Sequence, residues 1–568
     1  MTFKNPTPSM HKLGYVASAC ACALFVHSAC AQTSAPTAAD VQRNIDQNRQ
    51  ISNPAVPKPM AKKPLPPATT DQGFARLSAV QVNSPLFQDD LMAYWMSEIN
   101  KPVPAQKLND FKAFAWELFQ KKGYLAYINT SAQPTPEGSM LTVTVAFPSV
   151  GKVSVVTVDG DKGKEFAEEV ARRFTAIYKA GTPVDVQGFE NQLNAASYDL
   201  PVDLEVSLRQ VDAKLVDVVI NLRPADHKPG SILGGLVQLN NYGLEQFGKE
   251  QLLGNVRVAG FTPLSELSLT TQQSRGVGYY RADYFAPIVG TGMRWNVYAS
   301  QVRSDANDVR GLSNEAGVGL TKRLSTDRTG SWYTSTEVSK RQTQNWASVD
   351  LESANRTDQQ VRFKLRAESS KGWVDSFSNE VTLAAGSMSL NRNEQDKLSD
   401  DTGLKVAGSY QKLEMNGGLS HALSNDGVYT GTIRWRAQTA SKNLDTYNRI
   451  SLGGVNGIRA YTSLDGVGDQ GAQMSFDIIH QVVPDVYGGF FYDIGTVRKN
   501  RNPLVGETDT GYYTLQGLGL QVGGKIEDVN WSLSVAQAIG KNPGPGVWLS
   551  TNTQVGDWRM NLAVTKPF

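Results

Sequence analysis

From about residue 228 to the end of the chain, apolar and polar residues alternate in short runs that are separated by turn residues. Clear examples are 361–368, 433–438, 531–536 and 558–565. Such alternation is typical of strands with one apolar and one polar face. Counting these runs gives about sixteen, so the pattern predicts a transmembrane antiparallel β-barrel of about 16 strands over 227–568.

A soluble all-β domain is the alternative, and it would bury one strand face inside a sandwich. Basic residues recur at the positions that would face inward, among them Arg362, Lys364, Arg434 and Arg436. Charged side chains are costly in a dry core, so these rows favour a water-filled lumen. Closure of the barrel would also give every backbone group a partner without water.

The segment before the barrel has helical periodicity instead. Residues 73–150 are predicted as strand, helix, helix, strand and strand, with a first helix over 89–100. The second helix is expected to have Asn109 as its N-cap and Gly123 just after its end. The same order recurs over 151–226. Two successive α+β domains of one topology are therefore predicted, each with an open sheet edge that could pair with an extended chain.

The region from 32 to 72 has neither pattern. Its first part, to residue 53, is polar and rich in helix formers, with a weak apolar stripe at Val41, Ile45 and Ile51. This stripe is too weak to join a core, so the helix is expected to lie in a polar place. Residues 54–72 are rich in proline and predict an extended, semi-rigid linker. A disordered tail is the alternative.

Residues 1–31 are typical of a secretory signal, with a basic start, a short apolar core and a cleavage site between Ala31 and Gln32. A lipoprotein would use Cys30 instead, but His27 stands where an aliphatic residue is needed. All three cysteines lie within the first thirty residues. Beyond them the sequence excludes disulfides, thiol catalysis and a Cys/His zinc site.

Other composition features narrow the function only by exclusion. The formal net charge of +2 gives no argument for binding to nucleic acid. The sequence contains no G-x-S-x-G motif and no P-loop. We therefore expect no enzymatic activity, no metal and no cofactor.

One long glycine-rich stretch stands out within the alternating region. It lies in a predicted loop at 441–471 and contains Ile458-Arg459-Ala460-Tyr461. A loop of this length is uncommon unless it is functional or disordered. About thirty residues further on, the strand-like segment Phe491-Tyr492-Asp493-Ile494-Gly495 carries one carboxylate.

These two motifs resemble two marks of the superfamily of outer-membrane proteins that combine periplasmic POTRA domains with a β-barrel. The marks are a (V/I)RG(Y/F) tip on a loop tucked into the barrel and an F-x-D-x-G strand whose Asp meets the Arg of the tip. The first matches Ile458, Arg459, Ala460 and Tyr461, although Ala460 replaces the usual glycine. The second matches Phe491, Asp493 and Gly495. The glycine-rich loop with its Gly-Asp-x-Gly close is most similar to two-partner secretion transporters, the TpsB class of the haemolysin secretion/activation family.

The resemblance covers the chain from the polar helix to the last strand. It implies a plug helix at 32–53, POTRA domains at 73–150 and 151–226, and a barrel with a lumen loop held by Arg459 and Asp493. It implies export of an unfolded, adhesin- or haemolysin-like exoprotein of the TpsA class through the outer membrane of a Gram-negative bacterium, with the POTRA domains in the periplasm. Outer-membrane lipid and the barrel-assembly machinery would be further partners, and Phe568 resembles the signal that this machinery reads. A barrel-assembly insertase and a passive porin stay open as alternatives.

Overall fold

A computed structural model describes residues 37–49, 73–504, 511–540 and 553–568. Within these ranges it leaves out 122, 158–163, 177, 201, 212–213, 225–232, 263, 307–308, 327–329, 349–350, 370–373, 392 and 425. The predicted signal with its cleavage site at Ala31 and Gln32 lies outside the described residues, and so does the whole of 50–72, which includes all of the predicted proline-rich linker. None of the described helices has both the length and the apolar character needed to cross a bilayer.

Sixteen strands form a closed antiparallel barrel, which confirms the fold predicted from the alternating pattern. Each strand pairs with its neighbours along the chain, and β24 pairs with β7 to close the barrel. The strands are β7 (Leu233–Asn240), β8 (Gln251–Ala259), β9 (Glu266–Ser274), β10 (Val277–Ile288), β11 (Met293–Ala306), β12 (Val309–Thr326), β13 (Gly330–Ser348), β14 (Leu351–Ser369), β15 (Ser376–Ser389), β16 (Gly408–Ala422), β17 (Tyr429–Ala440), β20 (Gln470–Val483), β21 (Val486–Arg498), β22 (Tyr512–Ile526), β23 (Val529–Ile539) and β24 (Trp558–Pro567).

The two faces of the barrel wall differ as the alternation predicts. On β14, Val361 and Phe363 are exposed on the outer face. Arg362 lies between them in sequence and points inward, where it donates to Glu337 of β13 at 2.9 Å. An apolar outer face and a charged inner face are what a membrane barrel with a polar lumen requires.

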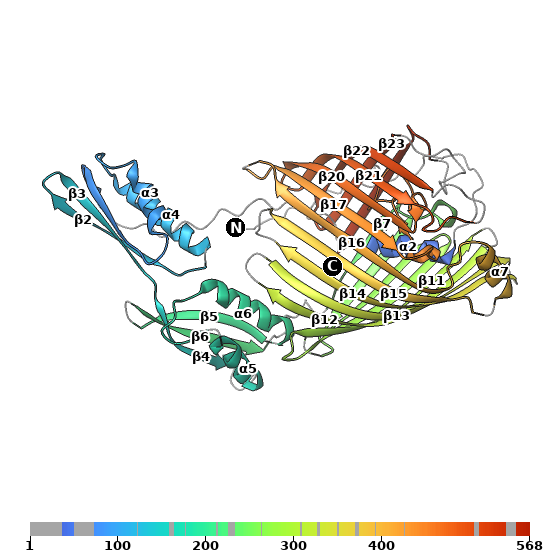
Figure 1. Ribbon diagram of the computed structural model, residues 1–568, viewed down its shortest axis with the longest axis horizontal. Coiled ribbons are helices and arrows are strands. Elements are labelled where there is room, and N and C mark those ends of the chain that lie inside the picture. Colours follow the sequence, from blue (N-terminus) through green and yellow to red (C-terminus); the bar gives the residue numbers. More distant parts are fainter. Residues whose placement is uncertain are drawn as a thin grey trace, which may run out of the picture.

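The chain before the barrel forms two small domains in a row (Figure 1). In the first, β1 (Leu77–Asn83), α3 (Gln88–Met96), α4 (Ala105–Lys121), β2 (Tyr127–Thr135) and β3 (Gly138–Ala146) follow the predicted order. Its sheet has the order β1-β3-β2, with β1 parallel to β3. The helices pack Trp95, Phe111 and Phe119 into one core. The predicted cap Asn109 is wrong, because α4 begins four residues earlier and holds Asn109 in its interior.

The second domain repeats this arrangement with β4 (Ser149–Thr157), α5 (Lys164–Thr175), α6 (Val186–Asp199), β5 (Val202–Gln210) and β6 (Leu215–Pro224). The sheet order β4-β6-β5 matches that of the first domain. The predicted boundary between 150 and 151 is wrong by a few residues, since it falls inside β4. The two sheets are joined by the two residues between β3 and β4.

Helix α2 (Ala38–Arg49) lies inside the barrel, as the blue helix among the strands in Figure 1. Its Gln42, Arg43 and Asn44 are buried in this polar place. The expectation that its apolar stripe joins no core is wrong. Val41 and Ile45 pack in a small lumenal cluster whose other members are Leu244, Phe247, Val277, Tyr279 and Val302. A short stripe suffices because the cluster that receives it is also small.

Candidate functional site

The loop between β17 and β20 folds back on itself inside the barrel. It spans 441–469 and ends two residues before the predicted end at 471, because β20 begins at Gln470. It contains η2 (Thr446–Asn448) and a two-stranded ribbon of β18 (Ile450–Ser451) and β19 (Val467–Gly468). We call this segment the lumen loop.

Glycine is required where the tip of the lumen loop doubles back. A Cβ atom on Gly453 would lie 2.0 Å from the carbonyl oxygen of Thr462, and one on Gly457 would lie 1.9 Å from that of Leu452. Real Cβ atoms do not approach oxygen so closely, so the two chain segments can meet only at glycine. The backbone amide of Ile458 then donates to Leu452 at 2.7 Å and turns the tip toward the wall.

Arg459 at this tip contacts Asp493 on β21 through two nitrogens on one edge of its guanidinium group. Nε donates to Oδ2 at 2.9 Å and Nη2 donates to Oδ1 at 2.7 Å. The backbone amide of Arg459 adds a third bond to Oδ2 at 3.0 Å. The side chains are 4% and 0% exposed. A buried bidentate pair of this kind is stronger and more directional than a surface ion pair.

Two further residues, Asp477 and Gln521, hold the same guanidinium group and were not found from the sequence. Nη1 donates to Asp477 of β20 at 2.8 Å and to Gln521 of β22 at 3.3 Å. The guanidinium carbon lies 3.4 Å from the centroid of the Phe491 ring. Phe491, which belongs to the predicted wall motif, therefore makes a cation–π contact with Arg459. The alternation of Phe476 and Ile478 could have identified Asp477 as inward-facing, but it could not assign it to Arg459.

Small residues in the wall make room for the tip. Ala460, which replaces the usual glycine, lies opposite Gly517, where an added Cβ would be 3.0 Å from the Cβ of Ala460. At Gly495 an added Cβ would be 3.2 Å from the side chain of Leu452. Ile458, Ala460 and Tyr461 are all buried against this part of the wall. The missing side chain at 517 offsets the extra methyl group at 460.

The other end of the lumen loop contacts α2. Tyr447 of η2 donates from its hydroxyl to Asp46 at 2.8 Å, and Arg43 donates to the carbonyl oxygen of Thr446 at 2.6 Å. Asn448 continues the contact to the wall by donating to Asp358 at 2.9 Å. Helix, loop and wall thus form one hydrogen-bonded unit.

Helix α2 also bonds directly to the wall. Gln42 donates to Glu315 at 3.0 Å and accepts from the hydroxyl of Ser313. The amide of Ala38 donates to Asn345 at 3.2 Å, and Asn44 donates to the carbonyl oxygen of Tyr242 at 3.4 Å. These partners come from β12, β13 and the segment after β7, so the helix is attached at several points around the lumen.

Phe568 lies where the end of β24 meets the start of β7. Its amide donates to Gly235 at 3.0 Å, and the amide of Gly235 donates back at 2.9 Å. The aromatic side chain is exposed. Its predicted role as an assembly signal stays a prediction.

Comparison with known proteins rests on structure, since no family model and no curated protein matches this sequence. CdiB from Escherichia coli is 13% identical with a TM-score of 0.55, covering 93% of this chain and 96% of its own. CdiB from Acinetobacter baumannii is 15% identical with a TM-score of 0.56, covering 94% and 100%. BamA from Haemophilus ducreyi lacking POTRA domains 1–3 is 10% identical with a TM-score of 0.51, covering 87% and 100%. The chain has the POTRA–barrel fold.

The second POTRA domain is attached to the barrel rim at the end of α6. Asp199 accepts two hydrogen bonds from Arg173 at 3.0 Å and one from the amide of Gly292, in the turn after β10, at 2.8 Å. Tyr198 stacks under the guanidinium group of Arg294 at 4.8 Å. One buried carboxylate therefore links the POTRA core to a turn of the barrel.

Charge pairing also organises the surface of this domain. Arg172 and Arg173 both donate to Glu169 of α5, at 2.6 and 2.8 Å. These hydrogen bonds lower the pKa of the Glu169 carboxyl to about 2. Because Arg173 also binds Asp199, the pair is connected to the junction with the barrel.

Strands β2 and β5 form open edges of the two POTRA sheets. The opposite edge of the second sheet is partly covered, because Val150 of β4 exchanges backbone hydrogen bonds with Gly181 and Thr182 at 2.8 and 2.7 Å. An open edge presents backbone donors and acceptors in a row. β5 is thus the better surface for pairing with an extended peptide.

Proposed function

We propose that this protein is an outer-membrane pore of the two-partner secretion class, which exports an unfolded exoprotein from the periplasm. The observation that carries the proposal is that the protein's own helix α2 lies inside the barrel and is held there largely by hydrogen bonds of polar side chains. Such hydrogen bonds can be exchanged for water at a net cost of about 1 kcal/mol each, or about 1.5–3 kcal/mol where the acceptor is a carboxylate. A helix held in this way can leave the lumen, and the barrel would then offer a passage for an extended chain.

The POTRA domains fit the first step of export. Edge strand β5 can pair with an extended segment of the exoprotein by β-augmentation, which requires no folded partner surface. The sequence contains no nucleotide-binding motif, so folding of the exoprotein outside the cell would supply the free energy. Residues 73–226 should bind the N-terminal region of a secreted partner while that region is unfolded.

A passive porin accounts poorly for two POTRA domains and a lumen-filling helix. A barrel-assembly insertase shares the fold, but a helix bonded to three sides of the lumen has no evident use in it. The insertase interpretation predicts that loss of the protein reduces assembly of other barrels. The export interpretation predicts that only the partner exoprotein fails to reach the surface.

The test uses the fact that every cysteine lies in the first thirty residues. Gln42→Cys with Ser313→Cys should allow a disulfide between α2 and β12, because the native side chains are in contact. Oxidation should abolish both channel openings and export of a co-expressed exoprotein, and reduction should restore both. The single-cysteine variants are the controls.

Removal of residues 36–53 should have the opposite effect and raise the conductance of the reconstituted pore. Undiminished export through the cross-linked protein would contradict the proposal, because the exoprotein would then pass by another route.

A further inference from the structure

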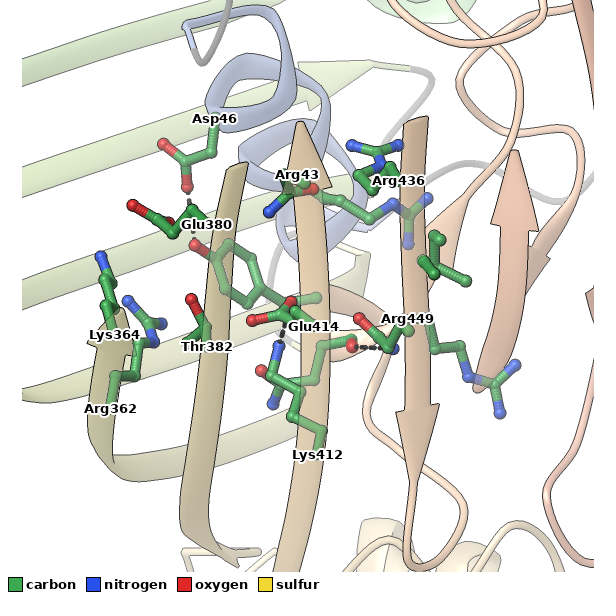
Figure 2. Close-up of a pocket in the computed structure, with 16 residues that line it drawn as sticks. Arg43, Asp46, Arg362, Lys364, Glu380, Thr382, Lys412, Glu414, Arg436 and Arg449 are labelled. Carbon is green, nitrogen blue, oxygen red and sulfur yellow. Dashed lines mark hydrogen bonds and ion pairs between the residues drawn. The ribbon is translucent and has the colours of Figure 1, made fainter. Parts of the chain in front are cut away.

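A polar cavity of about 130 Å³ lies in the lumen between α2, the wall strands β14 to β17 and the lumen loop (Figure 2). This volume is roughly that of four water molecules. Six basic and three acidic side chains line it: Arg43, Arg362, Lys364, Lys412, Arg436 and Arg449, with Asp46, Glu380 and Glu414. The lining is therefore richer in cations than in anions.

Most of these cations have a carboxylate partner that is identified. Lys412 pairs with Glu414 at 3.0 Å within the cavity. Arg43 pairs with Asp40 at 2.8 Å and Arg449 with Asp469 at 3.1 Å, through carboxylates that do not line the cavity. Arg362 and Lys364 share Glu337, also outside the lining, at 2.9 and 3.4 Å.

Arg436 differs from the other five. Its Nη2 donates to the carbonyl oxygen of Ser451 at 2.6 Å, but no carboxylate of the described residues lies within 4.0 Å of it. Its buried Nε has no hydrogen-bond partner among the described groups, and the same is true of Nε of Arg43. Arg43 is 3% exposed. Both arginines thus line one cavity, and in each of them one buried guanidinium nitrogen has no acceptor among the described groups.

The two arginines belong to different parts of the structure. Arg43 is on α2 and Arg436 is on β17, and both line the same cavity. Buried polar donors are normally satisfied, and a buried charge without a counter-charge is costly. An anion between them would give Arg436 a direct counter-charge, which Arg43 already has in Asp40, and would offer both guanidinium groups a further acceptor. The planar fork of arginine matches the oxygen atoms of tetrahedral oxyanions.

We propose that this cavity binds a phosphate- or sulfate-type oxyanion, which bridges Arg43 of α2 to Arg436 of the wall. Such an ion is roughly the size of two or three water molecules and fits the cavity. The bound anion holds α2 against β17, and its departure leaves two like charges facing each other. A ligand that binds only the closed arrangement shifts the equilibrium toward it. The anion is thus a removable link between the helix and the wall.

The first experiment measures binding with the full-length protein in detergent. Inorganic phosphate is titrated at constant ionic strength with chloride as the balancing salt, and sulfate is tested in parallel. Wild type should bind phosphate saturably with one site per chain. Arg436→Gln and Arg43→Gln should each weaken binding about tenfold or more, the expected loss for a charge-assisted hydrogen bond.

Arg559→Gln is the matched control, since Arg559 is an inward arginine of β24 that donates to Asn561 at 3.3 Å and does not line the cavity. Its binding of phosphate should equal that of wild type. Arg43 is on α2 and not on a barrel strand, so Arg43→Gln should leave the barrel folded. Weaker binding in this variant can then be assigned to the site and not to failure of the barrel to fold. Absence of saturable binding in wild type, or unchanged binding in both glutamine variants, would overturn the site.

The second experiment records openings of single channels in a planar bilayer. Phosphate should reduce the opening frequency of wild type at constant ionic strength, and it should have no such effect on Arg436→Gln. Equal opening in phosphate and chloride would overturn the link to α2. Neither measurement uses an exoprotein, so failure of the proposed export function and failure of this site remain distinguishable.

Discussion

Replacement of Arg459 by alanine tests the attachment of the lumen loop most directly. The change removes the bidentate bond to Asp493 and the bond to Asp477, while the backbone amide of residue 459 can still donate to Asp493. It leaves buried carboxylates behind. Loss of one partner from a buried ion pair costs about 3–5 kcal/mol, which corresponds to roughly a 10²- to 4 × 10³-fold higher population of the detached tip.

The barrel itself should stay folded, because its stability rests on strand pairing around a closed sheet. Hydrogen exchange of peptides from 452–469, followed by mass spectrometry on the reconstituted protein, reports the attachment of the tip. Exchange should accelerate in Arg459→Ala, while peptides from β13 and β14 exchange as in wild type. Export of the exoprotein should fall sharply if the attached loop is required for the working shape of the lumen.

Arg459→Lys is the matched control, because lysine keeps the charge but cannot make the bidentate contact. Its exchange should be intermediate. Asp493→Ala should resemble Arg459→Ala, and the double variant should be little worse than either single one. Wild-type protection of the tip in Arg459→Ala, or fully additive losses in the double variant, would refute the assignment of this pair as the attachment point.

Three further predictions concern the wall, the POTRA junction and pH. Gly517→Ala should lower the free energy of opening of the lumen loop, measured by hydrogen exchange, by about 1–3 kcal/mol through overpacking. Ala460→Gly should restore the protection in the double variant, and absence of this rescue would contradict direct contact between the two residues. Asp199→Ala should widen the distribution of distances between spin labels on α6 and the barrel rim, whereas an unchanged distribution would show that this carboxylate does not fix the junction. The lowered pKa of Glu169 means that its stabilisation is complete above about pH 4.5 and is lost as pH falls toward 2. Because Arg172 is exposed, this contribution is about 1 kcal/mol, and Glu169→Gln should remove it at pH 6 but change the protection of α5 little at pH 2.

The barrel and both POTRA domains can be predicted from the sequence, because each of them is encoded by a local pattern of apolar and polar residues. Alternation along β14 separates Val361 and Phe363 from Arg362 without knowledge of any other strand. The helix start of α4 was misplaced because Asn109 is a plausible cap by residue type, whereas tertiary packing of Leu108 and Phe111 extends the helix toward Ala105. Local preference is a weak guide where a buried face continues past a potential cap.

The lumenal contacts could be predicted only in part. Arg459 and Asp493 were paired through a family resemblance, and Asp477 was missed because alternation identifies the inward face but not the residues that meet across it. The contact of Gln42 with Glu315 joins positions 273 residues apart. Such pairs depend on barrel closure and on the depth of α2 in the lumen, neither of which is encoded in a local pattern.

The two elements that fill the lumen are held by different chemistry, and this difference bears on how the pore opens. The tip of the lumen loop combines a buried ion pair with an apolar cluster that includes Leu452, Ile458 and Tyr461. Helix α2 depends mainly on single hydrogen bonds, two of which join a neutral side chain to a carboxylate, and on the two apolar side chains Val41 and Ile45. Water can replace the single hydrogen bonds of α2 more easily than it can separate the buried bidentate ion pair of the tip. Helix α2 is therefore the element expected to leave first, while the tip stays on the wall and keeps Asp493 and Asp477 neutralised during passage of a chain.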